Sequence, residues 1–245
     1  SSDIVFSKGN EWYGISLKKK KLNTSGNPTL INKALTSIFD NKNFSNVIQQ
    51  INKETDEFFP KVIKEAKKEG LLDSNVNENQ WKKHISALNN SFVNSMLKRN
   101  DSIFKNIDKI ISKNATSIAD RLLNLILKME LKELQNDNFF FFLVTGIGDY
   151  GVKKGIDISQ AKVQDVDTIT EKLDELFEKG KIDIILDPSK KQAWDLDGDA
   201  AKIFYQLVIG DFPILNMEIR YKGTFTSQPQ FQATITKEFD KLLKK

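Results

Sequence analysis

The sequence predicts an α+β protein with a small mixed β-sheet core and a large helical lobe. Three patterns lead to this prediction. Short strand-like segments open the chain, apolar residues recur at three- and four-residue steps through its middle, and strand patterns return after residue 137. We expect a single domain over residues 1–245, with an α/β core formed by residues 1–27 and 138–245 and a helical insertion or lobe at residues 28–137.

The first two segments are predicted to form a hairpin. Residues 3–6 have the pattern of a short strand, residues 7–10 (Ser-Lys-Gly-Asn) that of a turn, and residues 11–18 that of the returning strand. We expect Phe6 to lie opposite Glu11 in this hairpin.

The two faces of the returning strand differ in polarity. Side chains alternate along a strand, so Ser16 and Lys18 share one face. With the register above, Asp3 is expected opposite Gly14 and diagonal to Ser16. The apolar face is expected to be buried and the polar face to be open; the apolar face carries Tyr13, Ile15 and Leu17.

The middle of the chain is predicted to be almost entirely helical. Asn27 followed by Pro28 is typical of a helix start, with Asn as the N-cap and Pro in the first turn. From there to about Asn136, apolar residues repeat at helical spacing. The clearest repeats are Leu30-Ile31-Ala34-Leu35-Ile38, Val47-Ile48-Ile51, Phe58-Phe59-Val62-Ile63-Ala66, Ile85-Leu88-Phe92-Met96 and Ile118-Leu122-Leu125-Leu131-Leu134.

After Asp137 the predicted elements are mixed. Residues 200–209 are amphipathic and fit either a helix or a strand. The other expected elements are strands at residues 139–144, 181–186 and 213–225, a helix at residues 168–179 ended by Gly180, and a further segment at residues 231–236 that leads into a closing helix at residues 237–243.

Composition excludes several classes of site. The chain has no cysteine, so disulfides, thiolate zinc sites and cysteine nucleophiles are excluded, and His84 is its single histidine. Any metal is therefore expected to be a hard, oxygen-bound ion such as Mg²⁺ or Mn²⁺. No apolar run reaches the ~20 residues of a membrane span. We expect a cytoplasmic protein, and, because Ser1 is not a methionine, a processed or trimmed chain.

Lysine dominates the positive charge. The formal net charge is +4, and of the 37 basic residues all but Arg99, Arg121 and Arg220 are lysine. Lysine contacts phosphate as a flexible point charge, whereas arginine reads guanine edges. The balance is compatible with nucleic-acid binding through the phosphate backbone, and equally with the codon bias of an AT-rich genome.

The N-terminal residues Asp3 and Ser16-Leu17-Lys18 resemble the motif of the PD-(D/E)XK nuclease superfamily. In that family an aspartate on one strand is followed, on the next, by an acid, any residue and a lysine. The resemblance covers the first ~40 residues and implies a restriction-endonuclease-like core. It implies that Asp3 binds the metal ion and that Lys18 orients the attacking water. Ser16 stands where the family carries its second acid.

Two further groups of residues could complete that site. The basic residues Lys19, Lys20 and Lys21 follow Lys18 and are expected to contact nucleic acid. Strand alternation places Glu218, Arg220 and Lys222 on one face, with Asn216 beside them. These could bind phosphate, with Glu218 as a further metal ligand, or form a cross-strand ion-pair ladder.

Three other patterns are interpreted as non-functional. Residues 146–151 spell G-x-G-x-x-G, but no helical repeat follows, as a dinucleotide fold requires. Residues 195–199 (Asp-Leu-Asp-Gly-Asp) look like a calcium loop with a misplaced glycine. His84 is expected to be a packed or solvent-facing side chain.

The sequence and this resemblance therefore predict a Mg²⁺- or Mn²⁺-dependent endonuclease that acts on DNA. Its expected catalytic residues are Asp3, Ser16 and Lys18, and a homodimer is an expected oligomeric state. The alternative is a non-catalytic nucleic-acid- or protein-binding module, for example a viral one, on a nuclease-like fold.

Overall fold

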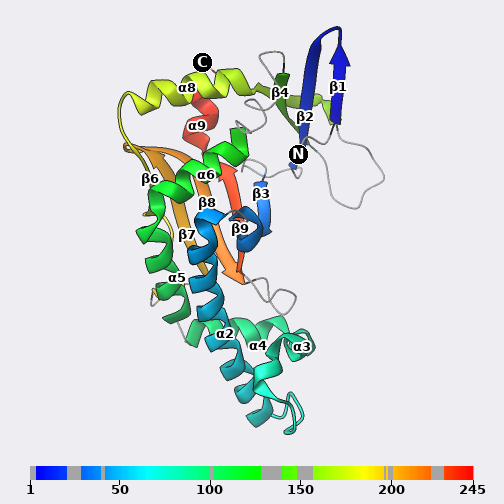
Figure 1. Cartoon of the computed structure of the whole chain (residues 1–245), viewed down its shortest axis with the longest axis vertical. Coiled ribbons are helices and arrows are strands. Elements are labelled where there is room, and N and C mark those ends of the chain that lie inside the picture. The colour runs from blue at the N-terminus through cyan, green and yellow to red at the C-terminus, as the bar shows by residue number, and fades with distance from the viewer. Residues whose placement is uncertain are drawn as a thin grey trace.

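The computed structural model describes residues 4–20, 29–39, 42–99, 102–127, 139–147, 157–195, 197, 201–221 and 229–244. It confirms a mixed α+β architecture (Figure 1). The helices are α1 (Leu35–Ile38), α2 (Ser45–Lys68), α3 (Trp81–His84), α4 (Asn90–Arg99), α5 (Ser102–Lys113), α6 (Ala115–Leu127), α8 (Val166–Phe177) and α9 (Lys237–Leu242).

The described strands form two sheets, where the sequence suggested one. The four-stranded sheet A has the order β1-β2-β4-β5, and the five-stranded sheet B has the order β3-β9-β8-β7-β6. The strands are β1 (Ile4–Lys8), β2 (Glu11–Lys20), β3 (Thr29–Ala34), β4 (Phe139–Ile147), β5 (Asp157–Asp165), β6 (Ile182–Leu186), β7 (Lys202–Ile209), β8 (Phe212–Tyr221) and β9 (Pro229–Ile235).

The N-terminal hairpin is present, but its expected register is wrong. Phe6 lies opposite Tyr13 rather than Glu11, and Lys8 lies opposite Glu11. The turn is therefore the two residues Gly9 and Asn10, with Gly9 in the left-handed region at φ 62°. Two-residue turns of this kind need a positive φ, and their twist matches that of the paired strands.

The expected helix that starts at Asn27-Pro28 is wrong for residues 29–34. This segment is β3, an edge strand paired antiparallel with β9, and only Leu35–Ile38 is helical. The apolar residues 30, 31, 34, 35 and 38 fit a helical repeat, but pairing with a strand some 200 residues later satisfies the backbone instead. Residues 27 and 28 lie outside the described part.

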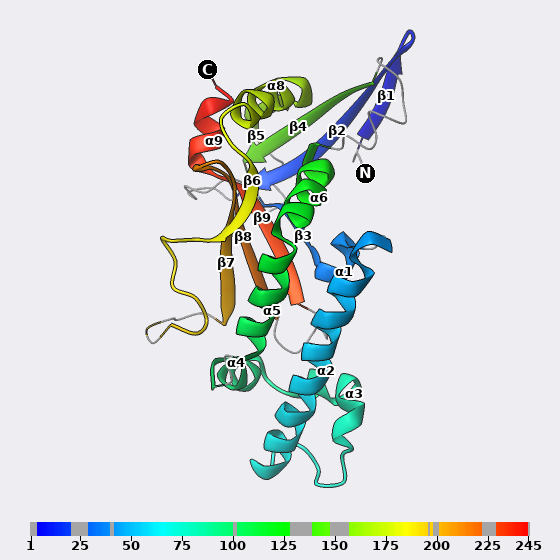
Figure 2. The same cartoon turned by 60° about the vertical axis from the view of Figure 1, so that its left-hand side comes forward.

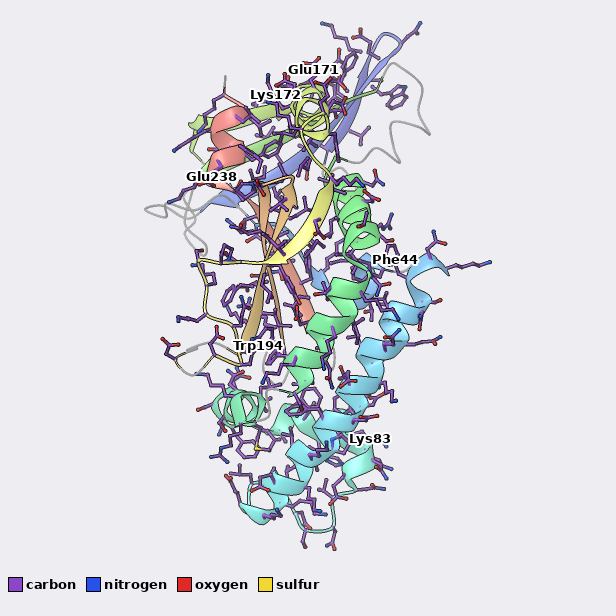
Figure 3. All side chains as sticks on the ribbon, turned by 90° about the vertical axis from the view of Figure 1, so that its left-hand side faces the viewer. Phe44, Lys83, Glu171, Lys172, Trp194 and Glu238 are labelled. Carbon is purple, nitrogen blue, oxygen red and sulfur yellow. The ribbon has the colours of Figure 1, made fainter. Side chains whose placement is uncertain are left out.

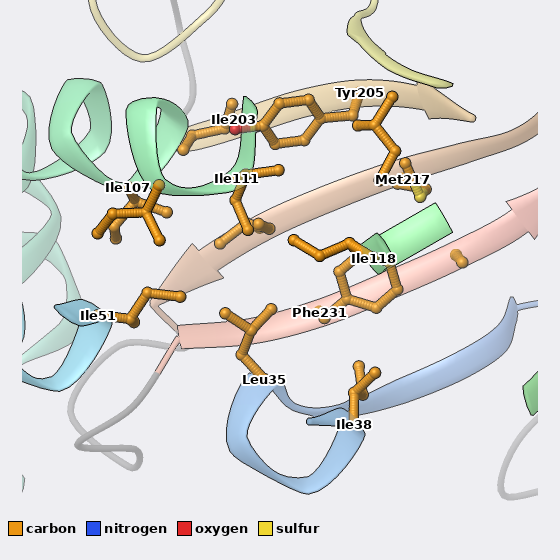
Figure 4. Packing of buried hydrophobic residues seen from close by; sticks show 14 of the residues in the cluster. Leu35, Ile38, Ile51, Ile107, Ile111, Ile118, Ile203, Tyr205, Met217 and Phe231 are labelled. Atoms are coloured by element: carbon orange, nitrogen blue, oxygen red, sulfur yellow. The ribbon is translucent and has the colours of Figure 1, made fainter. Parts of the chain in front are cut away.

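The core lies between sheet B and the helices. Along β7, β8 and β9 buried and half-buried residues alternate, so one face is apolar and the other polar. Helices α2, α5 and α6 cover the apolar face (Figure 2). Figure 4 shows the interdigitation: helix residues Ile51, Ile107, Ile111 and Ile118 pack with Ile203, Tyr205, Met217 and Phe231 of the sheet.

Sheet A has a different construction. Strand β4 lies parallel to β2 and antiparallel to β5, so this sheet is mixed, whereas the described pairs of sheet B are all antiparallel. Helix α8 packs on β4 and β5. A parallel pair needs a long crossover connection, and here the helices α1 to α6 lie between β2 and β4 in the chain.

The C-terminal half largely agrees with the sequence. Strands β4, β6 and β8 and helices α8 and α9 lie where they were expected, within a few residues, and the segment expected to lead into the closing helix is strand β9. The ambiguous segment at 200–209 contains strand β7, and β5 was not predicted. In the described part of the chain, helices lack the length and apolar content to cross a membrane.

Candidate functional site

The predicted catalytic residues are only partly within the described structure. Asp3 and Lys21 lie outside it, as does Lys222. Lys18, Lys19 and Lys20 occupy the last three positions of β2, where the backbone is placed. In the described register β1 begins with Ile4 opposite Ile15, the neighbour of Ser16.

The expected polarity of the β2 faces is wrong. Ser16 is 4% exposed and Gly14 is buried, so the face with the motif positions is covered at this point. The opposite face, with Tyr13 and Ile15, is half-buried, and Leu17 is exposed. Sequence alternation correctly separates the two faces. Which face is covered depends on tertiary packing.

The three lysines at the end of β2 lie beside the end of β4. Lys18 is opposite Thr145, Lys19 opposite Gly146 and Lys20 opposite Ile147, in a parallel pair. Both strands therefore end at the same edge of sheet A. In open sheets with parallel strands, ligands bind outside the carboxyl ends of the strands.

An open apolar face is the second feature of sheet A. The ring of Tyr13 stacks on Phe6 with centroids 4.9 Å apart and on Phe140 at 5.4 Å, so aromatic rings line up across three strands. Phe6 is 46% exposed and Val163, on β5, is 63% exposed. We call this surface the aromatic face; its members are Ile4, Phe6, Tyr13, Ile15, Leu17, Phe140, Phe142, Val144 and Val163.

The second predicted group forms an ion-pair ladder on sheet B. Glu218 accepts from Lys202 at 3.0 Å and faces the Arg220 guanidinium at 3.3 Å. The prediction that Glu218 and Arg220 share a face is confirmed, and Asn216 lies on the same face of β8. Both Glu218 oxygens therefore already have cationic partners.

Gln232 extends this ladder onto β9. With its side-chain amide oriented to suit its neighbours, its nitrogen donates to Glu218 at 2.8 Å and its oxygen accepts from Arg220 at 3.0 Å. Within the described residues, the buried Nε of Arg220 lacks a hydrogen-bond partner. The ladder thus joins β7, β8 and β9 and holds their polar side chains in place.

A hollow of about 480 Å³ lies over this polar face. Its floor is β7, β8 and β9, and its two walls are the turn after β6 and the first turn of α9. In Figure 3, Glu238 of α9 lies on the side of sheet B away from Phe44. We call this the polar hollow; it is lined by Asp187, Ser189, Lys190, Phe204, Gln206, Asn216, Met217, Glu218, Gln232, Thr234, Lys237 and Glu238.

Asp187 shapes one wall of the polar hollow. It is buried, and its Oδ1 accepts from both the backbone N–H of Ser189 at 2.9 Å and its hydroxyl at 2.7 Å. This closes the turn and holds Lys190 beside the hollow. Sequence reasoning interpreted Asp187-Pro188 only as the end of a strand.

The patterns interpreted as non-functional give no site among the described residues. The glycine-rich segment is largely outside them, and the next described element after it is strand β5. Asp195 accepts from the backbone of Gln192 at 2.6 Å, and Asp197 faces Lys191 at 3.5 Å. His84 ends the short helix α3 and is half-buried.

The described residues contain no cluster of three or more His, Asp and Glu side chains arranged to hold a metal ion. Asp3, the predicted metal ligand, is not among them. No protein-family model, curated protein or solved structure matches this chain.

Proposed function

We propose that this chain is a metal-dependent DNA endonuclease with a restriction-endonuclease-like core. The observation that supports it best is the run Lys18–Lys20 at the carboxyl end of β2, beside the parallel strand β4. Three successive cations at such an edge suit a phosphate backbone, because lysine contacts phosphate through charge alone.

The proposed chemistry combines this edge with the adjoining strand. Asp3 immediately precedes β1, the strand paired with β2. A carboxylate-bound Mg²⁺ or Mn²⁺ would lower the pKa of its bound water and offset charge on the phosphate. Lys18 would stabilise the same developing charge. Glu218 is held by Lys202 and Arg220 on sheet B, so the proposal rests on Asp3 for the metal.

Plasmid cleavage tests the proposal. Supercoiled DNA is incubated with the protein and Mg²⁺, Mn²⁺ or a chelator, beside Asp3→Ala, Lys18→Ala and the control Lys33→Ala, an exposed lysine of β3. We expect metal-dependent nicking or linearisation that falls by roughly a hundredfold or more in the first two variants and persists in the control. Cleavage that survives both variants would contradict this site.

Ser16 favours a second candidate, a non-catalytic nucleic-acid-binding module. A serine stands where nucleases of the PD-(D/E)XK superfamily, which the motif resembles, carry an acid, and this serine is buried. This candidate predicts salt-sensitive DNA binding without turnover under any metal. Asp3→Ala would then bind DNA as well as the native protein does, or more tightly, since an anionic group is removed.

A further inference from the structure

The polar hollow carries an inference beyond phosphodiester cleavage. Its volume of about 480 Å³ lies in the range of small-molecule sites, and strands β7, β8 and β9 give it a rigid floor. The side chains of this floor fall into two rows across the sheet. The rows differ in how many of their side-chain donors and acceptors already have hydrogen-bond partners within the protein.

The first row is internally satisfied. Phe204, Glu218 and Gln232 lie opposite one another on neighbouring strands. The Glu218 carboxylate is bonded to Lys202 and Arg220, and Gln232 bridges Glu218 and Arg220. This row fixes the geometry of the floor and has little capacity left for a charged ligand.

The second row offers a neutral donor beside a neutral acceptor. Gln206, Asn216 and Thr234 are cross-strand neighbours. Gln206 donates through Nε2 to Asn216 Oδ1 at 3.2 Å. That bond uses the Gln206 nitrogen and the Asn216 oxygen, which leaves the Gln206 oxygen and the Asn216 nitrogen for a ligand. Adenine presents the matching pair, the N6 donor and the N7 acceptor.

The rest of the hollow suits the other parts of a nucleotide. Phe204 lies on the same face as Gln206, two residues away, and its half-buried ring can stack on a base. The exposed side chains of Lys190 and Lys237 line the opposite walls, where they can meet a phosphate. Glu238, on the α9 wall, can accept from a sugar hydroxyl.

We propose that the polar hollow binds an adenine nucleotide, with the base held by Gln206 and Asn216 beside Phe204 and the phosphate directed toward Lys190 or Lys237. Affinity for the mononucleotide stands on this geometry alone. A second step, that this adenine belongs to a DNA strand bound by the protein and is read away from the cleavage site, rests on the proposed function.

Calorimetric titration with dAMP tests the proposal, in chelator so that cleavage plays no part. The 5′-monophosphate of purine 2′-deoxyriboside, which lacks the 6-amino donor of adenine, and a neutral disaccharide serve as comparison ligands. The variants are Asn216→Leu and Gln206→Leu, with Gln230→Leu as the control, a half-buried residue on the same face of β9 that does not line the hollow. We expect dAMP to bind the native protein and the control equally, and to bind each hollow variant roughly tenfold or more weakly.

A variant with nearly the same side-chain shape separates a loss of dAMP binding from a loss of folding. Asn216→Asp keeps the oxygen that accepts from Gln206 and removes the donor, so it is also expected to lose dAMP affinity. Equal binding of dAMP and of the purine nucleotide that lacks the 6-amino group, binding of the disaccharide alone, or dAMP affinity unchanged in all hollow variants would each overturn the proposal. Plasmid cleavage is measured separately, so a protein that cuts DNA without binding dAMP refutes only the nucleotide site.

Discussion

The hydroxyl of Tyr205 on β7 donates a hydrogen bond of 2.9 Å to Asp108 on α5. Tyr205 is 2% exposed, and its ring packs in the core between sheet B and the helices (Figure 4). The bond therefore ties the helical layer to the sheet at a point where water is largely excluded. It also gives a buried polar group the partner that it requires.

Removal of this hydroxyl should destabilise the protein. Tyr205→Phe leaves Asp108 with only the longer bond from Ser112 at 3.4 Å, so we expect the free energy of unfolding to fall by about 1–3 kcal/mol. Urea denaturation followed by circular dichroism measures the change. Ser112→Ala, at an exposed bond, should change it by less than about 0.5 kcal/mol. Equal stability of Tyr205→Phe and the native protein would show that this bond contributes nothing.

Two buried tyrosines predict sensitivity to alkaline pH. Burial, reinforced by Asp108, raises the pKa of Tyr205 above its usual 10.0, and burial also raises the pKa of Tyr221, which bonds Thr55 at 2.7 Å. A pKa raised in the folded state gives stability that is present below the unfolded-state pKa and is lost as the pH rises above it. The free energy of unfolding should therefore decline above about pH 10.

The matched variant is Tyr205→Phe with Tyr221→Phe. It should start from a lower stability at neutral pH and lose less between about pH 9 and 11, because the two groups no longer titrate. Denaturant titrations across this range measure the slope. Parallel curves for the variant and the native protein would mean that other groups cause the alkaline loss.

A close approach of two glycines predicts a steric requirement. A Cβ placed on Gly180 would lie 2.5 Å from the Cα of Gly210 and 2.7 Å from its nitrogen. These are backbone atoms at the turn between β7 and β8, where Gly210 has φ 58°, and they cannot move independently of the sheet. Gly180→Ala should cost about 1–3 kcal/mol in thermal or urea unfolding. Lys179→Ala, its exposed neighbour, should be nearly neutral, and equal effects of the two would contradict the clash.

The ion-pair ladder predicts a cost when its acid is removed. Glu218 is 18% exposed at its side chain and separates the cations Lys202 and Arg220. Glu218→Ala leaves those two like charges beside each other, so we expect a loss of about 1–3 kcal/mol in urea unfolding. Glu57→Ala breaks an exposed pair with Lys53 at 3.9 Å and should cost less than about 0.5 kcal/mol. If Glu218→Ala is as stable as Glu57→Ala, the ion-pair ladder does not contribute to the stability of the protein.

Local patterns predicted those features that depend on neighbouring residues. The hairpin turn region, the shared face of Glu218 and Arg220, and the stripes of α2 and α6 all follow from the alternation or helical periodicity of a short segment. Strand β3 was not predicted, because its apolar spacing also fits a helix and its partner β9 lies far along the chain. No short segment contains that information.

The open surfaces could not be predicted for a related reason. The apolar side of β2, with Tyr13 and Ile15, has the composition of a buried face, and only tertiary packing leaves it open while Ser16 is covered. The polar hollow takes its floor from three strands and its walls from residues 187–190 and 237–238. Residues this far apart meet only through the fold, and nothing in their local sequence marks them as a site.

The aromatic face predicts self-association. Monomeric proteins rarely expose contiguous apolar surface of this kind, and here Phe6 and Val163 are 46% and 63% exposed on the same side of sheet A. We expect the native protein to form a homodimer through the aromatic face.

Sedimentation over a range of protein concentrations measures this association. Phe6→Ser removes the outermost ring of the stacked row, and we expect the dimer dissociation constant to rise roughly tenfold or more. The control is Phe177→Ser, which changes a 42% exposed phenylalanine of α8 outside this face and should leave the constant unchanged. A native protein that stays monomeric at every concentration would refute the interface. Under the proposed nuclease function, a dimer would carry two copies of the Lys18–Lys20 edge, one for each DNA strand.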